Sequence, residues 1–180
     1  MYEALILYPG NPDWAPDSPA ILVDTLHACH LIDKHQAIAN RYEFGNEFAR
    51  LINFLGCSPT LYADDGSTGL FHILLPPSFN SPQLVAGDYA RPRCRQCKKP
   101  IAGWLQYVES NNLVCPHCGK IEDTGSMHWR RQGAVARTLI IIEGIMEGIA
   151  VPADILLAKL QSLSHSDWDY FYYCDSKPWP

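Results

Sequence analysis

Four of the seven cysteines occur in two closely spaced pairs, and this spacing is the strongest chemical signal in the sequence. Cys94 and Cys97 stand in CRQCKKP, Cys115 and Cys118 stand in CPHCGK, and 17 residues separate the pairs. Two residues between cysteines let both sulfurs face one ion from a tight turn. The pattern predicts a closed tetrahedral shell of four thiolates around a structural ion, with zinc as the expected metal. The alternatives are four unrelated cysteines or a redox pair, and two pairs at this distance favour the metal.

The two cysteine pairs resemble the two knuckles of the zinc-ribbon, or rubredoxin-like, class over about residues 91–121. The resemblance covers only this part of the chain and identifies no full-length family. CPHCG is also similar to a rubredoxin knuckle, which leaves iron as the alternative metal. Rubredoxins have a longer gap between their pairs and are normally whole proteins, so the resemblance favours zinc.

The segment between the pairs predicts how they come together. It contains SNN (residues 110–112), a turn signal with β-type residues on either side. This pattern is typical of a hairpin, which would bring the two knuckles onto one ion.

Charge is unevenly distributed along the chain. Residues 88–131 hold eight Lys or Arg against four acids, a formal charge of +4, whereas the remainder carries −9. Cations and aromatic residues around the knuckles predict a partner-binding surface. Its expected members are Arg93, Arg95, Lys98, Lys99, Trp104 and Trp129. Such a surface suits an acidic protein or a phosphate backbone, and the acidic remainder favours a protein because it would repel a long duplex.

The residues on either side of the cysteine module, which is predicted to span residues 88–131, predict an α+β body. The expected elements are a strand over 3–8, a helix from Ser18 and Pro19 with apolar positions as far as Ile32, a helix over 46–56, a hairpin around DDGSTG, a linker over 76–93, a strand over 135–144, a helix from Pro152 and a strand over 167–175. This order favours a ferredoxin-like sandwich, one sheet with helices on one face, carrying an inserted four-cysteine zinc ribbon. The body would comprise residues 1–87 and 132–180, and the insertion residues 88–131.

Several weaker groups of residues are open to two interpretations. Asp24, His27 and His30 recur at three-residue intervals and could hold a second metal, but a solvated helix face explains them better. His72 alternates with leucines and is interpreted as a hydrogen-bonded sheet histidine. The aromatic run DYFYYCD could stack bases, although buried sheet aromatics are the preferred interpretation. The cysteines outside the two pairs are expected to be small buried hydrophobes.

These observations favour a non-catalytic interaction or adaptor protein. An enzyme with its site in the α+β body is the alternative, although no motif nominates a nucleophile or base. An iron site would instead indicate a small electron carrier. The first ten residues lack the basic region of a signal peptide, and the longest apolar stretch is interrupted by Glu143 and Glu147. A cytoplasmic protein without a membrane segment is therefore expected, and no pattern indicates an oligomeric state.

Overall fold

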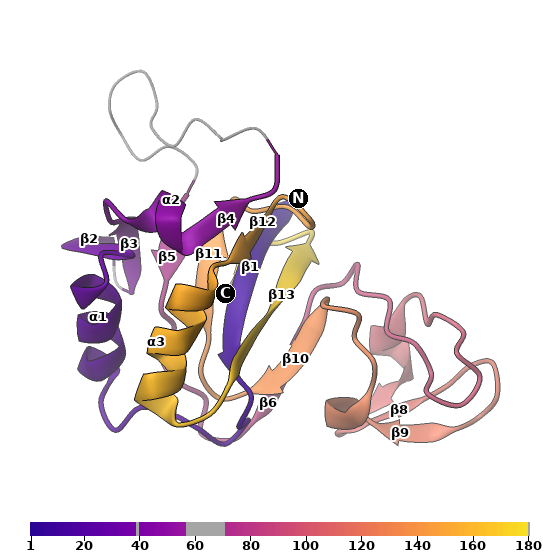
Figure 1. Ribbon diagram of the computed structural model, residues 1–180. Coiled ribbons are helices and arrows are strands. Elements are labelled where there is room, and N and C mark those ends of the chain that lie inside the picture. The colour runs from indigo at the N-terminus through magenta and orange to yellow at the C-terminus, as the bar shows by residue number, and fades with distance from the viewer. Residues whose placement is uncertain (39, 57–70, 180) are drawn as a thin grey trace.

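The computed structural model describes residues 1–38, 40–56 and 71–179, with the backbone alone for 34–38, and has a mixed α/β architecture (Figure 1). The helices are α1 (Pro19–Ala28), α2 (Phe48–Leu51) and α3 (Asp154–Ser164), together with the short 3-10 helices η1 (Trp104–Tyr107) and η2 (Thr124–Ser126). Among the described residues, none of the helices has the length and apolar character that crossing a bilayer requires.

The largest sheet has six strands in the order β13-β1-β11-β5-β3-β2, and all neighbours are antiparallel. The strands are β1 (Tyr2–Pro9), β2 (Ile32–Ile38), β3 (Arg41–Phe44), β5 (Ile73–Leu74), β11 (Ile140–Glu143) and β13 (Trp168–Asp175). β1 lies at the centre of the body because its apolar run pairs with β11 on one side and β13 on the other. Leu5, for example, stands opposite Ile142 and Tyr172.

Three smaller antiparallel sheets complete the described strands. β4 (Ile52–Phe54) pairs with β12 (Ala150–Pro152), and β6 (Gln83–Ala86) pairs with β10 (Gly133–Ala136). β7 (Val108–Glu109), β8 (Asn112–Val114) and β9 (Ile121–Asp123) form the third sheet, inside the cysteine module. The β6–β10 pair brackets that module in the sequence, and the module projects from the body beyond it (Figure 1).

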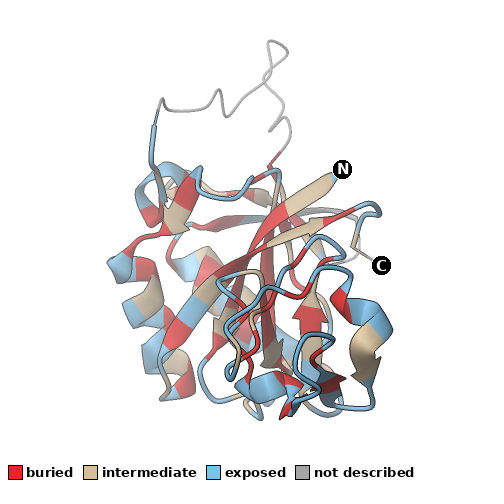
Figure 2. Cartoon of the chain, turned by 90° about the vertical axis from the view of Figure 1, so that its right-hand side faces the viewer, coloured by how far each residue is buried: buried red, intermediate tan, exposed pale blue. Residues whose placement is uncertain are grey.

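Alternate residues of β1 pack into two separate hydrophobic cores. Leu5 and Leu7 pack with apolar residues of α1 and α3, whereas Ala4 and Ile6 pack with Val85 and neighbouring residues of β6 and β10. Buried residues are accordingly concentrated on the central strands (Figure 2). The helices therefore cover one face of the large sheet, and the β6–β10 pair covers part of the other.

The predicted start of the first helix is confirmed, but its predicted end is wrong. Ser18 Oγ accepts a hydrogen bond from Ala20 N at 3.3 Å, and proline occupies the first helical position. The helix ends at Ala28, because His30 has a left-handed backbone with φ of 58°. Ile32, which the helical spacing places on the core face of the helix, instead begins β2.

The second predicted helix is wrong for most of its length. Only Phe48–Leu51 is helical, and Ile52–Phe54 forms β4, where Ile52 is fully buried. Pairing with β12 satisfies the backbone groups that a longer helix would have satisfied internally. A contact about 100 residues away in the sequence thus overrides the local helical pattern.

Other boundaries also differ from the expected ones. The linker over 76–93 contains β6, and the strand over 135–144 is divided into the end of β10 and β11. Between them, Arg137 N donates to Pro12 O at 3.1 Å, so that segment leaves the sheet to bond a loop. The last predicted helix begins two residues later than expected, because Pro152 ends β12. The hairpin around DDGSTG lies outside the described residues.

Candidate metal centre

The two cysteine pairs lie in tight turns with the same backbone hydrogen bonds. In the first turn, Lys98 N donates to Cys94 O at 3.0 Å and Cys94 N donates to Lys99 O at 3.1 Å. In the second turn, Gly119 N donates to Cys115 O at 2.9 Å and Cys115 N donates to Lys120 O at 2.8 Å. The predicted turn between the pairs also forms, since β7 and β8 pair on either side of Ser110 and Asn111. Residues 104–107, however, are a 3-10 helix and not a strand.

The four cysteine sulfurs gather at one point. All four Sγ atoms lie within 4.8 Å of one another, and Cys94 Sγ to Cys118 Sγ and Cys97 Sγ to Cys115 Sγ are each 3.7 Å. Thiolates at about 2.3 Å from a tetrahedral zinc ion stand about 3.8 Å apart, so the donor set and its spacing fit such an ion. Both 3.7 Å contacts join one knuckle to the other, which means that a bound ion would cross-link the two turns.

The first cysteine of each pair is buried, and the second lies nearer the solvent. Cys94 and Cys115 are 0% and 2% exposed, whereas Cys97 is half-buried and Cys118 exposed. Burial raises the pKa of the Cys94 thiol to about 12, whereas the backbone N–H of Lys99 lowers the pKa of Cys97 to about 7. Both cysteines would bind the ion as thiolates, so metal binding would be accompanied by release of the proton of Cys94.

The fifth residue of each turn has a left-handed backbone, with φ of 61° at Lys98 and 71° at Gly119. Only glycine adopts this conformation without a steric cost. We therefore expect Lys98→Gly to bind zinc about fivefold more tightly than Lys98→Ala, a difference of about 1 kcal/mol, as measured by competition with a chelator. Both variants lack the lysine charge, so the comparison isolates the effect of Cβ. Equal affinities would show that Lys98 is not strained in the turn.

Glu122, on β9, contacts the first knuckle and was not predicted. Its Oε1 accepts a hydrogen bond from Arg95 N at 2.9 Å and lies 3.5 Å from Cys94 Sγ. The residue is only 8% exposed. No local signal marks it, because an acid in a short polar strand is usually exposed. The backbone N–H of Arg95 compensates for part of the cost of burying this carboxylate beside the sulfurs.

The two tryptophans predicted to anchor a partner are buried inside the module. Trp104 and Trp129 are 3% and 6% exposed, and their rings meet edge to face with centroids 5.0 Å apart. The indole of Trp104 donates to Gly87 O at 3.2 Å, and that of Trp129 donates to Thr124 O at 2.8 Å. Their contacts are those of a structural core. They are not exposed anchors in this fold, because both side chains are buried in the core of the module.

The four cations predicted to bind a partner differ in their exposure to solvent and in their hydrogen bonds. Arg93 is half-buried and its Nη1 donates to Lys98 O at 3.1 Å, so it helps to hold the first knuckle. Arg95 is exposed, although its Nη1 donates to Ser126 O at 3.2 Å. Lys98 and Lys99 are exposed. The two lysines are therefore the most accessible cations of this set.

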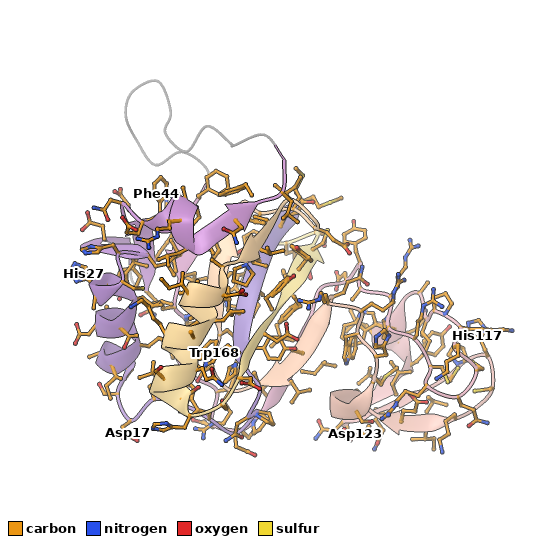
Figure 3. All side chains as sticks on the ribbon, viewed as in Figure 1. Asp17, His27, Phe44, His117, Asp123 and Trp168 are labelled. Carbon is orange, nitrogen blue, oxygen red and sulfur yellow. The ribbon has the colours of Figure 1, made fainter. Side chains whose placement is uncertain are left out.

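The weaker candidates in the body are not brought into one site. His27 lies on α1, on the far side of the body from His117 and Asp123 of the module (Figure 3). The ring centroids of His27 and His30 are 6.4 Å apart. Within the described residues, the four paired cysteines are the only group of potential metal ligands that converges on one point. The second metal considered for α1 is therefore not supported there.

His72 belongs to a chain of polar contacts across the large sheet. Its Nδ1 lies 3.2 Å from Arg41 Nη2, and Arg41 Nε is 2.9 Å from Glu143 Oε2. Glu143 Oε1 accepts from Tyr2 OH at 2.9 Å. Burial, followed by the Glu143 charge, raises the pKa of Tyr2. Both oxygens of Glu143 are engaged, so this arrangement ties strands together and leaves no free base on that carboxylate.

Comparison with protein-family models, with curated proteins and with solved structures gave no match to this chain.

Proposed function

We propose that this chain is a non-catalytic zinc-binding interaction protein, and that its cysteine module is a zinc ribbon that docks a partner. The gathering of four sulfurs, with 3.7 Å contacts between two knuckles, on a projecting module carries the proposal. A four-thiolate shell leaves no open position for a substrate, so the ion would support the docking surface. Zinc is proposed over iron because closed structural sites with these ligands typically hold zinc.

An acidic protein is the proposed partner. The module has a formal charge of +4 and the remainder of the chain −9, counted without a metal. Zinc and four thiolates together carry a charge of −2, which lowers the module to about +2. Such a small positive charge beside an acidic body suits a limited protein contact better than a long duplex. The accessible cations at its centre would be Lys98 and Lys99, with Arg95 beside them.

The body is proposed to be of the ferredoxin-like type, interrupted by the ribbon at residues 88–131. The strand order β13-β1-β11-β5, with all neighbours antiparallel, supports this assignment. So does the packing of α1 and α3 against the same core. Pairing of β6 with β10 brings the two ends of the proposed insertion together, which suits a module that leaves and rejoins the body at one place.

The docking surface is tested with a partner captured from the host cells by the zinc-loaded protein and then purified. We expect the combined change Arg95→Ala, Lys98→Ala and Lys99→Ala to slow association about tenfold while changing dissociation much less, because peripheral charges mainly accelerate encounter. Surface plasmon resonance at two ionic strengths measures both rates.

The matched control removes three exposed cations from the body, at Arg50, Lys159 and Lys177. It should leave association with the partner unchanged or faster, since it makes the body more acidic. Equal slowing by both triple variants would refute a localised surface. Retention of DNA or RNA that weakens steeply between about 50 and 200 mM salt, and disappears in the module variant, would replace the protein partner with nucleic acid.

A further inference from the structure

A cleft with a volume of about 760 Å³ separates the C-terminal arm of the cysteine module from the body. The module contributes Asp123 and residues 125–131, and the body contributes Tyr8 and the following loop, residues 133–135 of β10, and Asp169 and Tyr170 of β13. Ligand sites commonly have volumes of about 300–1,000 Å³ and favour junctions between structural units. The volume and place of this cleft fall within those ranges, and none of its residues is a cysteine of the metal cluster.

A strained turn brings two arginines to the cleft. Gln132 N donates to Trp129 O at 3.0 Å, and the two central residues, Arg130 and Arg131, have φ of 54° and 58°. Left-handed values at both positions define a type I′ β-turn, which strongly prefers Asn followed by Gly. Arginine is an unfavourable choice for the backbone here. Strain of this kind persists where a side chain is needed for something other than the turn.

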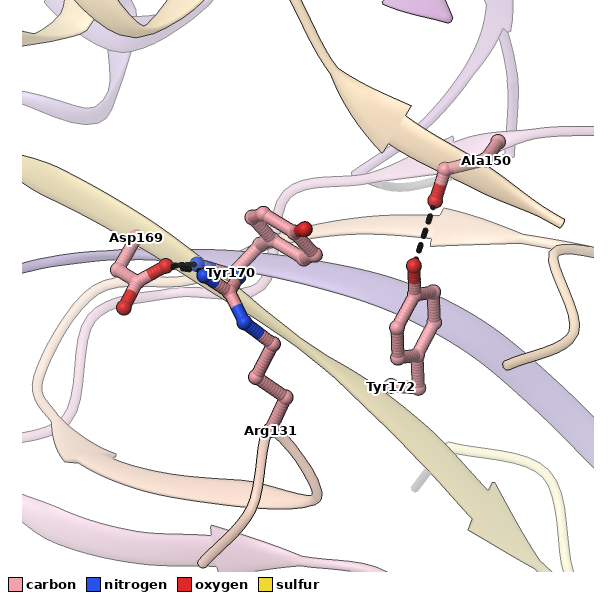
Figure 4. A network of polar contacts seen from close by, with 5 residues as sticks. All are labelled: Arg131, Ala150, Asp169, Tyr170 and Tyr172. Carbon is pink, nitrogen blue, oxygen red and sulfur yellow. Dashed lines mark hydrogen bonds and ion pairs between the residues drawn. The ribbon is translucent and has the colours of Figure 1, made fainter. Parts of the chain in front are cut away.

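Arg131 is already engaged and shapes the wall of the cleft. Its Nη1 lies 3.1 Å from Asp169 Oδ1, and its guanidinium stands 4.1 Å from the centroid of the Tyr170 ring (Figure 4). Its carbonyl oxygen accepts from Tyr172 N at 2.8 Å, which fixes the turn against β13. Asp169 is therefore neutralised, and Tyr170 is held in place by the arginine.

Arg130 and His128 are exposed beside this wall and line the same cleft. In the described part of the chain, neither side chain makes a hydrogen bond or an ion pair. The other acid of the cleft, Asp123, accepts from Ser126 N at 3.2 Å through Oδ1. The cleft thus combines an unpaired, permanently charged guanidinium and an imidazole with the half-buried aromatic ring of Tyr8.

We propose that this cleft binds a phosphate ester of an aromatic base, with the phosphate at Arg130 and His128 and the base against Tyr8. A guanidinium can bind phosphate through two parallel hydrogen bonds, and tyrosine rings stack on bases of any sequence. The ligand is either a free mononucleotide or an unpaired stretch of nucleic acid, which share this chemistry. This site goes beyond the proposed docking function and uses residues other than Arg95, Lys98 and Lys99.

The test is calorimetric titration of the zinc-loaded full chain with adenosine 5′-monophosphate, adenosine and inorganic phosphate. We expect the monophosphate to bind at one site, adenosine to bind at least about tenfold more weakly, and inorganic phosphate to compete. Arg130→Asn should weaken binding of the monophosphate by about tenfold or more while leaving the melting temperature unchanged or higher, because Asn tolerates the left-handed turn. Arg130→Ala is a second variant, which removes the guanidinium without introducing the side-chain amide of asparagine.

Lys159→Ala removes an exposed cation from α3 and is the control for diffuse charge. It should change the affinity less than twofold. A short unpaired oligoadenylate in the same titration distinguishes the two sources: tighter binding than the monophosphate assigns a strand, and weaker binding assigns the free nucleotide. The proposal is overturned if neither probe binds at millimolar concentration, if Arg130→Asn binds like the wild type, or if Lys159→Ala weakens binding equally.

Discussion

Replacing Cys115 with serine should release the metal and unfold the cysteine module while the body remains folded. Cys115 is 2% exposed, and its Sγ lies 3.7 Å from that of Cys97 in the other knuckle. A structural zinc ion contributes about 10–16 kcal/mol of apparent binding free energy to the folding of a small module. The body has two apolar cores of its own, which do not depend on the sulfurs.

Elemental analysis should find close to one zinc per chain in the wild type and almost none in Cys115→Ser. Tryptophan fluorescence should shift to the red as Trp104 and Trp129 become hydrated, and the dispersed amide signals of the body should persist in NMR spectra. Cys174→Ser is the control, because Cys174 is half-buried on β13 and lies outside the sulfur cluster. Loss of all dispersed signals in Cys115→Ser would contradict a separable module, and a red iron-containing protein would contradict the assignment of zinc.

Replacing Gly87 with alanine should destabilise the junction between the module and the body. Gly87 follows β6, and a Cβ at this position would overlap the carbonyl oxygen of Cys174 on β13. Gly87 directly follows β6, whose last residue, Ala86, pairs with Gly133 of β10, and β13 is fixed by an eight-residue register with β1. Overpacking of this kind costs about 2–3 kcal/mol of unfolding free energy, which denaturant titration would measure.

The same substitution should disturb the module, because Gly87 O accepts the indole N–H of Trp104 at 3.2 Å. Gly56→Ala is the matched control. Among the described residues, a Cβ there meets no atom within 4 Å, so the free energy of unfolding should change by less than about 0.5 kcal/mol. If Gly87→Ala is as stable as Gly56→Ala, β6 can move away from β13, and the junction is looser than its contacts indicate.

Local sequence patterns were sufficient wherever neighbouring residues supply the whole interaction. Ser18 and Pro19 predicted the start of α1, since a capping hydroxyl and the amides that it bonds lie within the same turn. SNN predicted the reversal between β7 and β8 for the same reason. Local patterns gave wrong predictions where pairing with a segment distant in the sequence overrides the local preference. The helical period over 46–56 could not reveal that Ile52–Phe54 would pair with β12.

The sequence by itself determined the four candidate metal ligands, because two residues between cysteines set the direction of both sulfurs within a single turn. Only the tertiary structure decided that Trp104 and Trp129 form the core of the module, since burial depends on which distant surfaces meet. The same applies to Glu122 beside Cys94, and to the cleft that Arg130 and Tyr8 both line. Each of these contacts joins residues that no local period relates, so they arise only when the sheets assemble.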